Sequence, residues 1–512
     1  MSKRTVVLLI LDGWGIGKSD ESNPIHVVNP ENLRAIRLRF PAGSLQASGI
    51  SVGLPWGEEG NSEVGHLNIG TGQVIYQHYP KITLSVRDKT FFQNPVLKKA
   101  FGHARDNQSS VNIVGLLTSG NVHSSLEHLR ALLQFAEQEK ISKINLHLFT
   151  DGRDSSPYSA INLLKEIPRE LLASLSGRFY AMDRDNHWER TERVYKVLLG
   201  DGEIVEDVEA HVKKTYAKNF NDEYVEPTLT GKAKRPIQSN DAVIFFDFRE
   251  DRMRQIASPF ALPTFNKFAV KKLSNVYLAT MTEYEPDFKA EVAFRPEKPQ
   301  NSLGKILSEN QKVQFRIAET QKYPHITYFF NGLVEEPYKN EYRVLIPSRK
   351  TPRQDDHPQM MTPEITQRLV ESVSEGVFDF VLTNFANPDM IAHTGNYEAC
   401  LEAVRSVDDA LGKIMEVCLQ TNSILVVTSD HGNIERVFDP LTGLTETKHD
   451  PGPVPFYLIA KEFEKQKTVS EIQREETQTI GILADVAPTI LELMNLPKPK
   501  EMTGQSLLKA LL

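Results

Sequence analysis

The segment Ser423–Asn433 reads SILVVTSDHGN, in which a short apolar run leads directly into Asp430, His431 and Gly432. The run has the length and the β-branched composition of a buried strand. Carboxylate and imidazole groups at the exit of such a strand lie where open α/β sheets bind their ligands. Both groups are metal ligands, and Gly432 permits the backbone bend that Asp430 and His431 need to bind one ion together. The segment therefore predicts a metal site at the edge of an α/β sheet.

Two further segments add candidate ligands. Asn387–Gly395 reads NPDMIAHTG, and its Asp389 and His393 share a face if the segment is helical. The alternative for this pair is a solvated helix surface with a capping aspartate. Thr447–Phe456 reads TKHDPGPVPF and contributes His449, which taken alone is typical of an ordinary surface or core histidine. Together with the first segment these residues indicate a site for more than one divalent ion, although spacing leaves open which ligand serves which ion.

Apolar runs recur along the chain and alternate with longer segments of helical period. Their continuous apolar character predicts strands covered on both faces, and hence mainly parallel sheets in an α/β fold. Polar residues follow several runs, as expected for ligand-binding edges. The predicted strands are Val6–Leu11, Val111–Leu117, Ile144–Phe149, Ala242–Phe246, Val276–Ala279, Phe378–Leu382, Ile424–Val427 and Phe456–Ile459, and the predicted helices include Ser125–Glu139, Pro363–Ser374 and Tyr397–Leu419.

The domain organisation follows from the chemistry. If Asp12 and a serine near position 60 join the ligands at 389–449, the two ends of the chain share one domain and the middle is an insertion. The chain is expected to enter and leave the inserted domain through polar or proline-rich segments. Two segments have this composition, Tyr76–Tyr79 and Arg295–Asn301. We predict two three-layer α/β domains: a discontinuous domain, 1–76 and 300–512, and an inserted domain, 77–299.

Composition narrows the class of protein. At 512 residues, with 40% hydrophobic and 25% charged residues, the chain is globular and too long for one core. A net charge of −8 argues against a nucleic-acid or membrane partner. Cys400 and Cys418 are expected to be small core residues rather than a disulfide framework. The first apolar run, Val6–Leu11, is too short for a signal peptide, so a cytoplasmic location is expected. The segment Lys461–Thr479 is charged and poor in apolar residues, and it is expected to lie at the surface.

The segment Gly60–Gly70, GNSEVGHLNIG, presents Ser62 on a glycine-rich turn. One interpretation makes Ser62 a helix N-cap with Glu63 in the first turn. The other makes it a nucleophile, because a serine hydroxyl beside two cations becomes reactive through metal coordination. No GxSxG motif competes for that role.

Several arginines occur in the segments TDGRDSSP, AMDRDNHWER and DFREDRMR. The planar guanidinium group binds phosphate and carboxylate oxygens in a bidentate manner. Surface ion pairs with adjacent carboxylates are the alternative. Asp154 could act as an acid–base group or cap a helix near Pro157. The arginines concerned are Arg153, Arg184, Arg190, Arg249 and Arg252.

In order and across nearly the whole chain, the sequence resembles the cofactor-independent phosphoglycerate mutase family. The resemblance rests on the blocks LLILDGWGI, GNSEVGHLNIG, VHSSLEHL, TDGRDSSP, MDRDNHWER, ETQKYPHITYFFNG, NFANPDMIAHTG, TSDHGN and LADVAPTILELMNLPKPKEMTGQSL. It implies interconversion of 2- and 3-phosphoglycerate in glycolysis and gluconeogenesis through a phosphoserine. It also implies an alkaline-phosphatase-like domain interrupted by a transferase domain, in a cytoplasmic monomer with two divalent ions. Mn²⁺ is the expected metal, with Mg²⁺, Zn²⁺ or Co²⁺ as alternatives.

Carried over by position, the resemblance assigns a role to each candidate residue. One ion is held by Asp389, His393 and His449, and the other by Asp12, Ser62, Asp430 and His431. Ser62 becomes the nucleophile, and Asp154 and Lys322 join it as catalytic residues. The substrate-binding residues are His123, Arg153, Asp154, Arg184, Arg190, Arg249, Arg252 and Lys322.

The chain departs from the family pattern at a few places. The family usually has SDGGVHSH where this chain has TSGNVHSS around His123, and Asp450 stands where a threonine is common. Two rival functions remain at this point. A metal-dependent phosphatase, phosphonate or sulfate-ester hydrolase would use similar ligands but would not need the arginines of the inserted segment. A non-catalytic sensor of phosphometabolites would not need every metal ligand to be intact.

Overall fold

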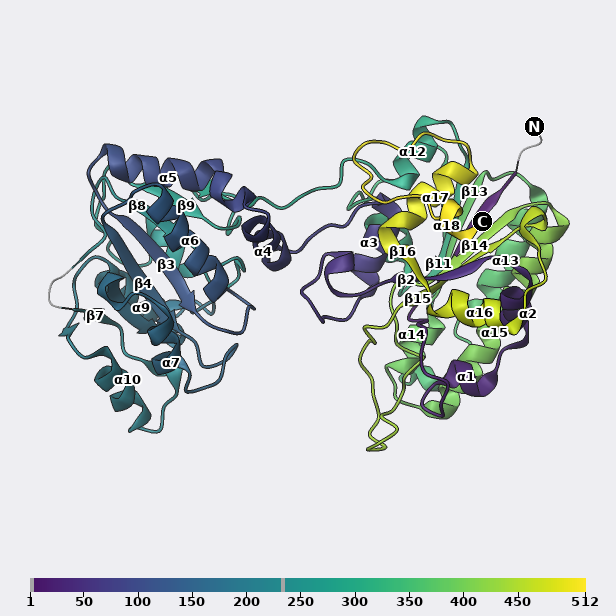
Figure 1. Ribbon diagram of the computed structural model, residues 1–512, viewed down its shortest axis with the longest axis horizontal. Helices are drawn as coiled ribbons and strands as arrows, with labels where there is room; N and C mark the ends of the chain where they lie inside the picture. The colour runs from purple at the N-terminus through teal and green to yellow at the C-terminus, as the bar shows by residue number, and fades with distance from the viewer. Residues whose placement is uncertain (1–3, 232–234) are drawn as a thin grey trace. The chain divides into compact units, whose positions relative to one another are not determined.

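The computed structural model describes residues 4–231 and 235–512. The chain forms two compact units, unit 1 from Met1–Gln77 with Glu297–Leu512 and unit 2 from His78–Pro296. In Figure 1 the yellow segments near the C-terminus and the purple strand β2 belong to unit 1, and the blue segments around β3 and β4 belong to unit 2. The functional assignment of these units as phosphatase and transferase domains stays a prediction.

Unit 1 is built on an eight-stranded sheet of order β12-β11-β13-β1-β14-β15-β2-β16. Every neighbouring pair is parallel except the two that involve β15, which is antiparallel to both β14 and β2. The strands are β1 (Val6–Leu11), β2 (Ala42–Gln46), β11 (Gln314–Glu319), β12 (Glu341–Ile346), β13 (Phe380–Phe385), β14 (Ile424–Thr428), β15 (Val454–Ile459) and β16 (Thr479–Ile482).

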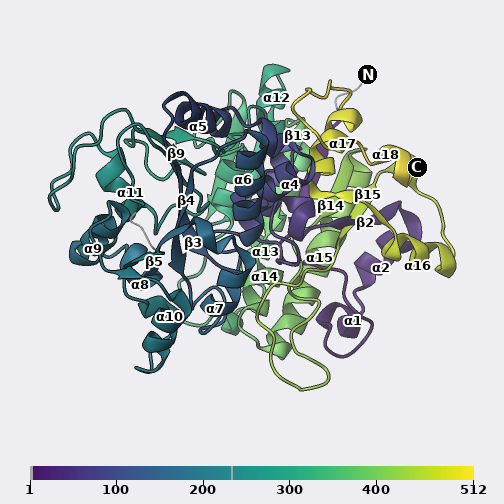
Figure 2. The same ribbon diagram turned by 60° about the vertical axis from the view of Figure 1, so that its left-hand side comes forward.

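Helices cover both faces of this sheet, because alternate residues of the central strand β1 enter different cores. Val7 and Leu9 pack with α2, α13, α14 and α15, whereas Leu8 and Ile10 pack with α3, α12 and α17. Helix α15 lies beside α13 and α14 (Figures 1 and 2). The helices are α1 (Pro24–Val28), α2 (Glu31–Arg39), α3 (Ser62–Thr71), α12 (Leu303–Glu309), α13 (Thr362–Glu375), α14 (Asn387–Ala392), α15 (Tyr397–Gln420), α16 (Val469–Thr477), α17 (Val486–Leu493) and α18 (Leu508–Leu511).

Unit 2 contains a second eight-stranded sheet, of order β10-β9-β8-β3-β4-β5-β7-β6. All neighbouring pairs are parallel except β5 with β7. The strands are β3 (Val111–Leu117), β4 (Ile144–Thr150), β5 (Leu172–Gly177), β6 (Ile204–Val205), β7 (Thr228–Thr230), β8 (Ala242–Phe245), β9 (Tyr277–Thr280) and β10 (Glu291–Val292).

The sheet of unit 2 is also covered on both faces. Ile113 of β3 packs in one core with α5 and α6, and Val114 packs in the opposite core with α9 and α11. The α/β class with mainly parallel sheets is therefore confirmed for both units. The helices are α4 (His78–Arg87), α5 (Pro95–Asp106), α6 (Leu126–Gln138), α7 (Ala160–Leu163), α8 (Arg178–Ala181), α9 (Trp188–Leu198), α10 (Val208–Tyr216) and α11 (Arg254–Ala261).

The predicted elements match the structure with shifted ends, and several strands escape prediction. The run expected at Phe378–Leu382 forms a strand two residues later, and β5, β11 and β12 carried no clear apolar signal. Cys400 and Cys418 are buried free thiols on α15, as expected. Among the described residues, no helix combines the length and apolar composition needed to cross a membrane.

Candidate active site

The candidate residues of unit 1 gather at the carboxyl edge of its sheet. Asp12 follows β1, Asp430 and His431 follow β14, and Lys322 follows β11. Asp389 lies in α14, the helix that comes directly after β13. Because β1, β11, β13 and β14 run parallel, their carboxyl ends open on the same edge, where α/β sheets bind ligands.

One group consists of Asp389, His393 and His449. The Nε2 atoms of the two histidines lie 3.1 Å apart, and they lie 3.2 and 3.4 Å from Asp389 Oδ1. Each Nδ1 donates to a carbonyl oxygen, that of Thr447 for His393 and that of Gly60 for His449, at 2.8 and 2.7 Å. With the Nδ1 atoms committed in this way, the two Nε2 atoms face each other beside the Asp389 carboxylate, whose hydrogen bond raises the pKa of His393. The donor set fits a divalent cation of the kind that nitrogen and oxygen ligands hold.

A second group consists of Asp12, Asp430, His431 and Ser62. His431 Nε2 lies 3.0 Å from Ser62 Oγ, 3.5 Å from Asp12 Oδ1 and 3.6 Å from Asp430 Oδ2. Ser62 Oγ donates to Asp12 Oδ1 at 3.2 Å. The ligand atoms of Asp12, Asp430 and His431 all lie within 4.8 Å of one another, and all three side chains are buried. This geometry also fits one cation.

Ser62 is the first residue of α3, not its cap. The cap is Asn61, whose Oδ1 accepts a hydrogen bond from Val64 N at 3.0 Å. The N-cap interpretation of Ser62 is therefore wrong, because the hydroxyl points to Asp12 and His431 instead. The positive end of the helix dipole lies at this hydroxyl and favours negative charge there.

Lys322 joins the two groups. Its ammonium lies 2.5 Å from Asp12 Oδ1, 2.8 Å from Asp389 Oδ2 and 2.8 Å from Ser62 Oγ. Burial opposes its charge, but the carboxylates of Asp12 and Asp389 outweigh burial and raise the pKa of Lys322. The group is therefore a permanent cation that donates to the serine oxygen.

The electrostatics of the edge favour positive charge. Burial opposes protonation of His431, but the carboxylates of Asp430 and Asp12 raise the pKa of His431 to about 10. Burial likewise opposes ionisation of Asp430, yet the neighbouring histidines hold its pKa well below the usual range. Lys322 and the histidines likewise hold the pKa of the buried Asp389 carboxyl well below its usual range, so Asp389 and Asp430 stay ionised and would attract divalent ions.

In unit 2, His123 and Asp154 form a close pair. His123 Nδ1 lies 2.6 Å from Asp154 Oδ2, and Arg178 Nη1 lies 3.0 Å from Asp154 Oδ1 and 2.5 Å from Asp151 Oδ1. Burial would raise the pKa of Asp154, but the hydrogen bond from His123 and the charge of Arg178 lower it. The alternative role of Asp154 as a helix cap is not seen, since Asp222 Oδ2 accepts from Ala160 N at the start of α7.

The predicted arginines engage carboxylates, as the ion-pair interpretation anticipated. Arg184 and Arg249 lie 2.7 and 3.3 Å from Asp251. The arginines also act on one another: burial, followed by the charges of Arg178 and Arg184, lowers the pKa of Arg252. The remaining pairs are Arg153 with Glu223 and Arg190 with Asp183, and Arg252 donates to Met182 O. Half-exposed guanidinium groups that repel one another form a site suited to an anion.

Two residues of the site were given no role from the sequence. Arg178 follows β5 without a recognisable motif, and Asn384, which donates to Asp12 Oδ2 at 2.6 Å, is one of many polar residues that follow a strand. Position at the carboxyl end of a strand was the one available clue for both.

A protein-family model described as the metalloenzyme superfamily matches residues 4–498. Together with the two ligand groups, this match places the chain in the metalloenzyme superfamily.

Known proteins narrow the class further. The 2,3-bisphosphoglycerate-independent phosphoglycerate mutase of Clostridium botulinum (strain Langeland) is 44% identical over 521 residues, which cover 99% of this chain and 100% of the relative. The enzyme of the same name from Clostridioides difficile (strain 630) is 42% identical over 520 residues, with 99% and 100% covered. A crystal structure of Leishmania mexicana phosphoglycerate mutase at low cobalt concentration matches with a TM-score of 0.52 and 26% identity, covering 99% of this chain and 98% of that one. The chain belongs to the 2,3-bisphosphoglycerate-independent phosphoglycerate mutase family.

A stability prediction follows from Asp247, a buried carboxyl just beyond β8. Its Oδ1 accepts from Leu116 N at 2.8 Å, its Oδ2 has no hydrogen-bond partner among the described residues, and burial raises the pKa of Asp247 to about 8. A folded-state pKa above the unfolded value destabilises the fold increasingly as pH rises from about 4 to about 8. We expect Asp247→Asn to stabilise the protein at pH 8 by on the order of 1 kcal/mol or more, and little at pH 4.5.

Thermal unfolding at both pH values tests this expectation. Asp241→Asn is the matched control, because the buried Asp241 carboxylate accepts from Ser110 N, Asn112 Nδ2 and Gln238 N. An Asp247→Asn variant that is no more stable than wild type at pH 8 would contradict the account.

Proposed function

We propose that the chain interconverts 2- and 3-phosphoglycerate through a phosphoserine on Ser62, as a monomeric, cytoplasmic enzyme of glycolysis and gluconeogenesis. The observation that carries the proposal is the setting of Ser62 Oγ. It lies within 3.2 Å of Asp12, His431 and Lys322, beside a second ligand group. Family membership and the cationic site of unit 2 add support.

Two divalent ions would be held by the two ligand groups, one by Asp389, His393 and His449 and the other by Asp12, Ser62, Asp430 and His431. When bound, such ions supply Lewis-acid charge at a coordinated hydroxyl and at phosphoryl oxygens. We expect Mn²⁺ to serve best, with Mg²⁺, Zn²⁺ or Co²⁺ as alternatives, because the mixed nitrogen and oxygen donors accept all four.

The residues of unit 1 prepare the attack. The hydroxyl proton of Ser62 leaves along its hydrogen bond to Asp12, and the Lys322 ammonium stabilises the developing oxyanion. Ser62 Oγ then forms a bond to phosphorus while the bond from phosphorus to the glycerate oxygen breaks. Positioning and charge stabilisation supply most of the catalysis in such transfers.

The residues of unit 2 suit the glycerate. Converging guanidinium groups would hold its carboxylate, and Asp154 with His123 would give a proton to one hydroxyl oxygen and take one from the other. Phosphoryl return to the second oxygen regenerates Ser62. Retention of glycerate separates this reaction from simple ester hydrolysis, which has no need of the arginines.

Rapid quenching with 3-phosphoglycerate and Mn²⁺, followed by peptide mass spectrometry, tests the proposal. We expect one phosphoryl group on the peptide that contains Ser62, and 2-phosphoglycerate as the product. Release of free phosphate in its place would establish a hydrolase, and absence of any turnover would favour a binding protein.

Substitution of the nucleophile gives a second prediction. Ser62→Ala removes the attacking oxygen, so we expect kcat to fall by roughly 10⁴-fold or more while the circular dichroism spectrum stays unchanged. Ser470→Ala, at an exposed position on α16, is the control and should retain full activity. Near-wild-type mutase activity in Ser62→Ala would refute the nucleophile assignment.

Metal binding should release protons. The raised pKa of His431 means that the metal-free protein carries a proton there at pH 7.5, which an ion must displace to use Nε2. We expect about one proton or more to be released per chain, and metal affinity to weaken as pH falls. Calorimetric Mn²⁺ titrations in buffers of different ionisation enthalpy measure this release, and a binding heat that is independent of the buffer would contradict it.

A further inference from the structure

Glu435 is a buried carboxyl group to which the proposed chemistry assigns no role. Its side chain is 1% exposed. Within the described part of the chain, no lysine, arginine or histidine lies at ion-pair distance from it, although Lys18 and Arg436 line the same cavity. A buried acid without a counter-charge costs stability, so its presence calls for a compensating interaction.

That interaction is with two backbone segments that carry candidate metal ligands. Glu435 Oε2 accepts hydrogen bonds from Gly15 N and from Asn433 N, each at 2.8 Å. Gly15 belongs to the loop that follows Asp12, and Asn433 belongs to the loop that follows His431. One oxygen atom therefore joins the exits of β1 and β14.

The backbone around the carboxyl group leaves no room for side chains. A Cβ atom at Gly15 would lie 2.0 Å from Glu435 Oε1, and one at Gly432 would lie 2.1 Å from the same atom. Both loops thus close directly onto the carboxyl group. Their separation is set by the reach of this one side chain.

The contact extends to both ligand groups. Asn433, held at its backbone by Glu435, donates from Nδ2 to Asp389 Oδ1 at 2.8 Å. On the other loop, Gly13 N donates to Asp430 Oδ1 at 3.2 Å. A shift of the Asn433 loop would therefore disturb Asp389 of the first group, and a shift of the Gly13 loop would disturb Asp430 of the second.

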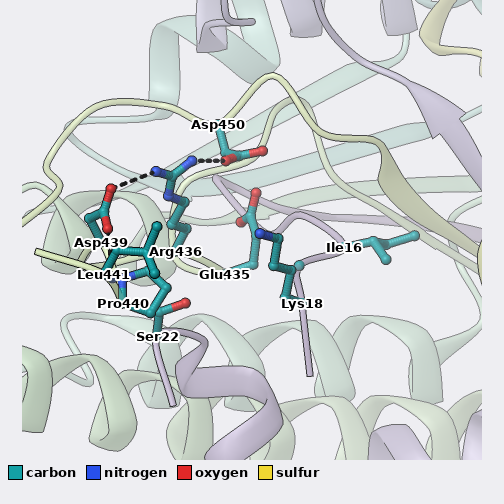
Figure 3. Close-up of a pocket in the computed structure, with 10 residues that line it drawn as sticks. Ile16, Lys18, Ser22, Glu435, Arg436, Asp439, Pro440, Leu441 and Asp450 are labelled. Atoms are coloured by element: carbon teal, nitrogen blue, oxygen red, sulfur yellow. Dashed lines mark hydrogen bonds and ion pairs between the residues drawn. The ribbon is translucent and has the colours of Figure 1, made fainter. Parts of the chain in front are cut away.

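The outer side of Glu435 borders a cavity of about 570 Å³. Figure 3 shows Arg436 directed at Asp439 and Asp450, with Glu435 beside them. Glu435 Oε1 has no hydrogen-bond partner among the described residues. Burial, followed by the charge of Asp450, raises the pKa of Glu435 to about 7, so the site tolerates a neutral group. Length, rather than charge, is the property that the two amides require.

We propose that Glu435 is a positioning residue that fixes the spacing of the Asp12 loop and the Asp430–His431 loop, and so sets the affinity of both ion sites without touching an ion. The inference rests on the ion sites of the proposed function. Partners of this outer kind typically change metal affinity by about 10- to 100-fold when they are removed.

Two substitutions separate length from charge. Glu435→Gln keeps the length and an accepting oxygen but removes the charge, and we expect Mn²⁺ affinity within about 3-fold of wild type. Glu435→Asp keeps the charge but withdraws the oxygens by one methylene, and we expect both sites to weaken by about 10-fold or more. Arg436→Ala, which alters the same cavity without touching the amides, is the control and should bind as wild type does.

Titration of metal-free protein with Mn²⁺, followed by electron paramagnetic resonance of the free ion, gives the affinities without reference to turnover. At saturating Mn²⁺, Glu435→Asp should recover kcat to within several-fold with an unchanged KM. Wild-type affinity in a folded Glu435→Asp variant, or equal weakening in Glu435→Gln and Glu435→Asp, would overturn the proposal. Tight Mn²⁺ binding by Ser62→Ala without turnover would leave it intact, whereas wild-type protein that binds no Mn²⁺ would overturn the ion sites and the positioning role together.

Discussion

The site depends on one constraint, the close approach of two imidazole nitrogens and a carboxylate oxygen at the edge of the sheet. His393 and His449 commit their Nδ1 hydrogens to backbone carbonyls, and their Nε2 atoms lie 3.1 Å apart. Such an arrangement needs positive charge at its centre, which a proton on His393, whose pKa the hydrogen bond to Asp389 raises, or a divalent cation can supply. Around His431, Nε2 likewise lies close to the oxygens of Ser62, Asp12 and Asp430, and Lys322 joins the two groups. The rest of unit 1 holds these donors in place.

The parallel strands bring metal ligands from distant parts of the chain to the same edge of the sheet. Asp12 and Asp430 are separated by more than four hundred positions, yet β1 and β14 are hydrogen-bonded neighbours with Ile10 opposite Thr428. The exits of both strands therefore open side by side. Beyond the ends of the strands, where strand pairing no longer fixes the distance between the two loops, Glu435 joins them through hydrogen bonds to Gly15 N and Asn433 N.

Much of this could be predicted from the sequence, for identifiable reasons. Long apolar runs such as Val6–Leu11 are buried on both faces, so composition alone indicates a strand. Strands β11 and β12 were not predicted, because charged residues interrupt their apolar pattern. Arg316 in β11 is fully buried and lies 3.4 Å from Glu341 in β12, a compensation that single-strand patterns do not show.

The same limit applies to the site. Asp389, His393, Asp430 and His431 lie at spacings that local geometry explains, and motifs therefore reveal them. His123 and Lys322 came from the family resemblance alone, and Arg178 was missed. Their partners lie far away in the sequence, so only the assembled sheets bring them together.

Anomalous diffraction from crystals soaked in Mn²⁺ tests the central claim most directly. The account predicts two manganese peaks per chain, one among Asp389, His393 and His449 and one among Asp12, Asp430 and His431. A single peak, or peaks away from these two ligand groups, would contradict it.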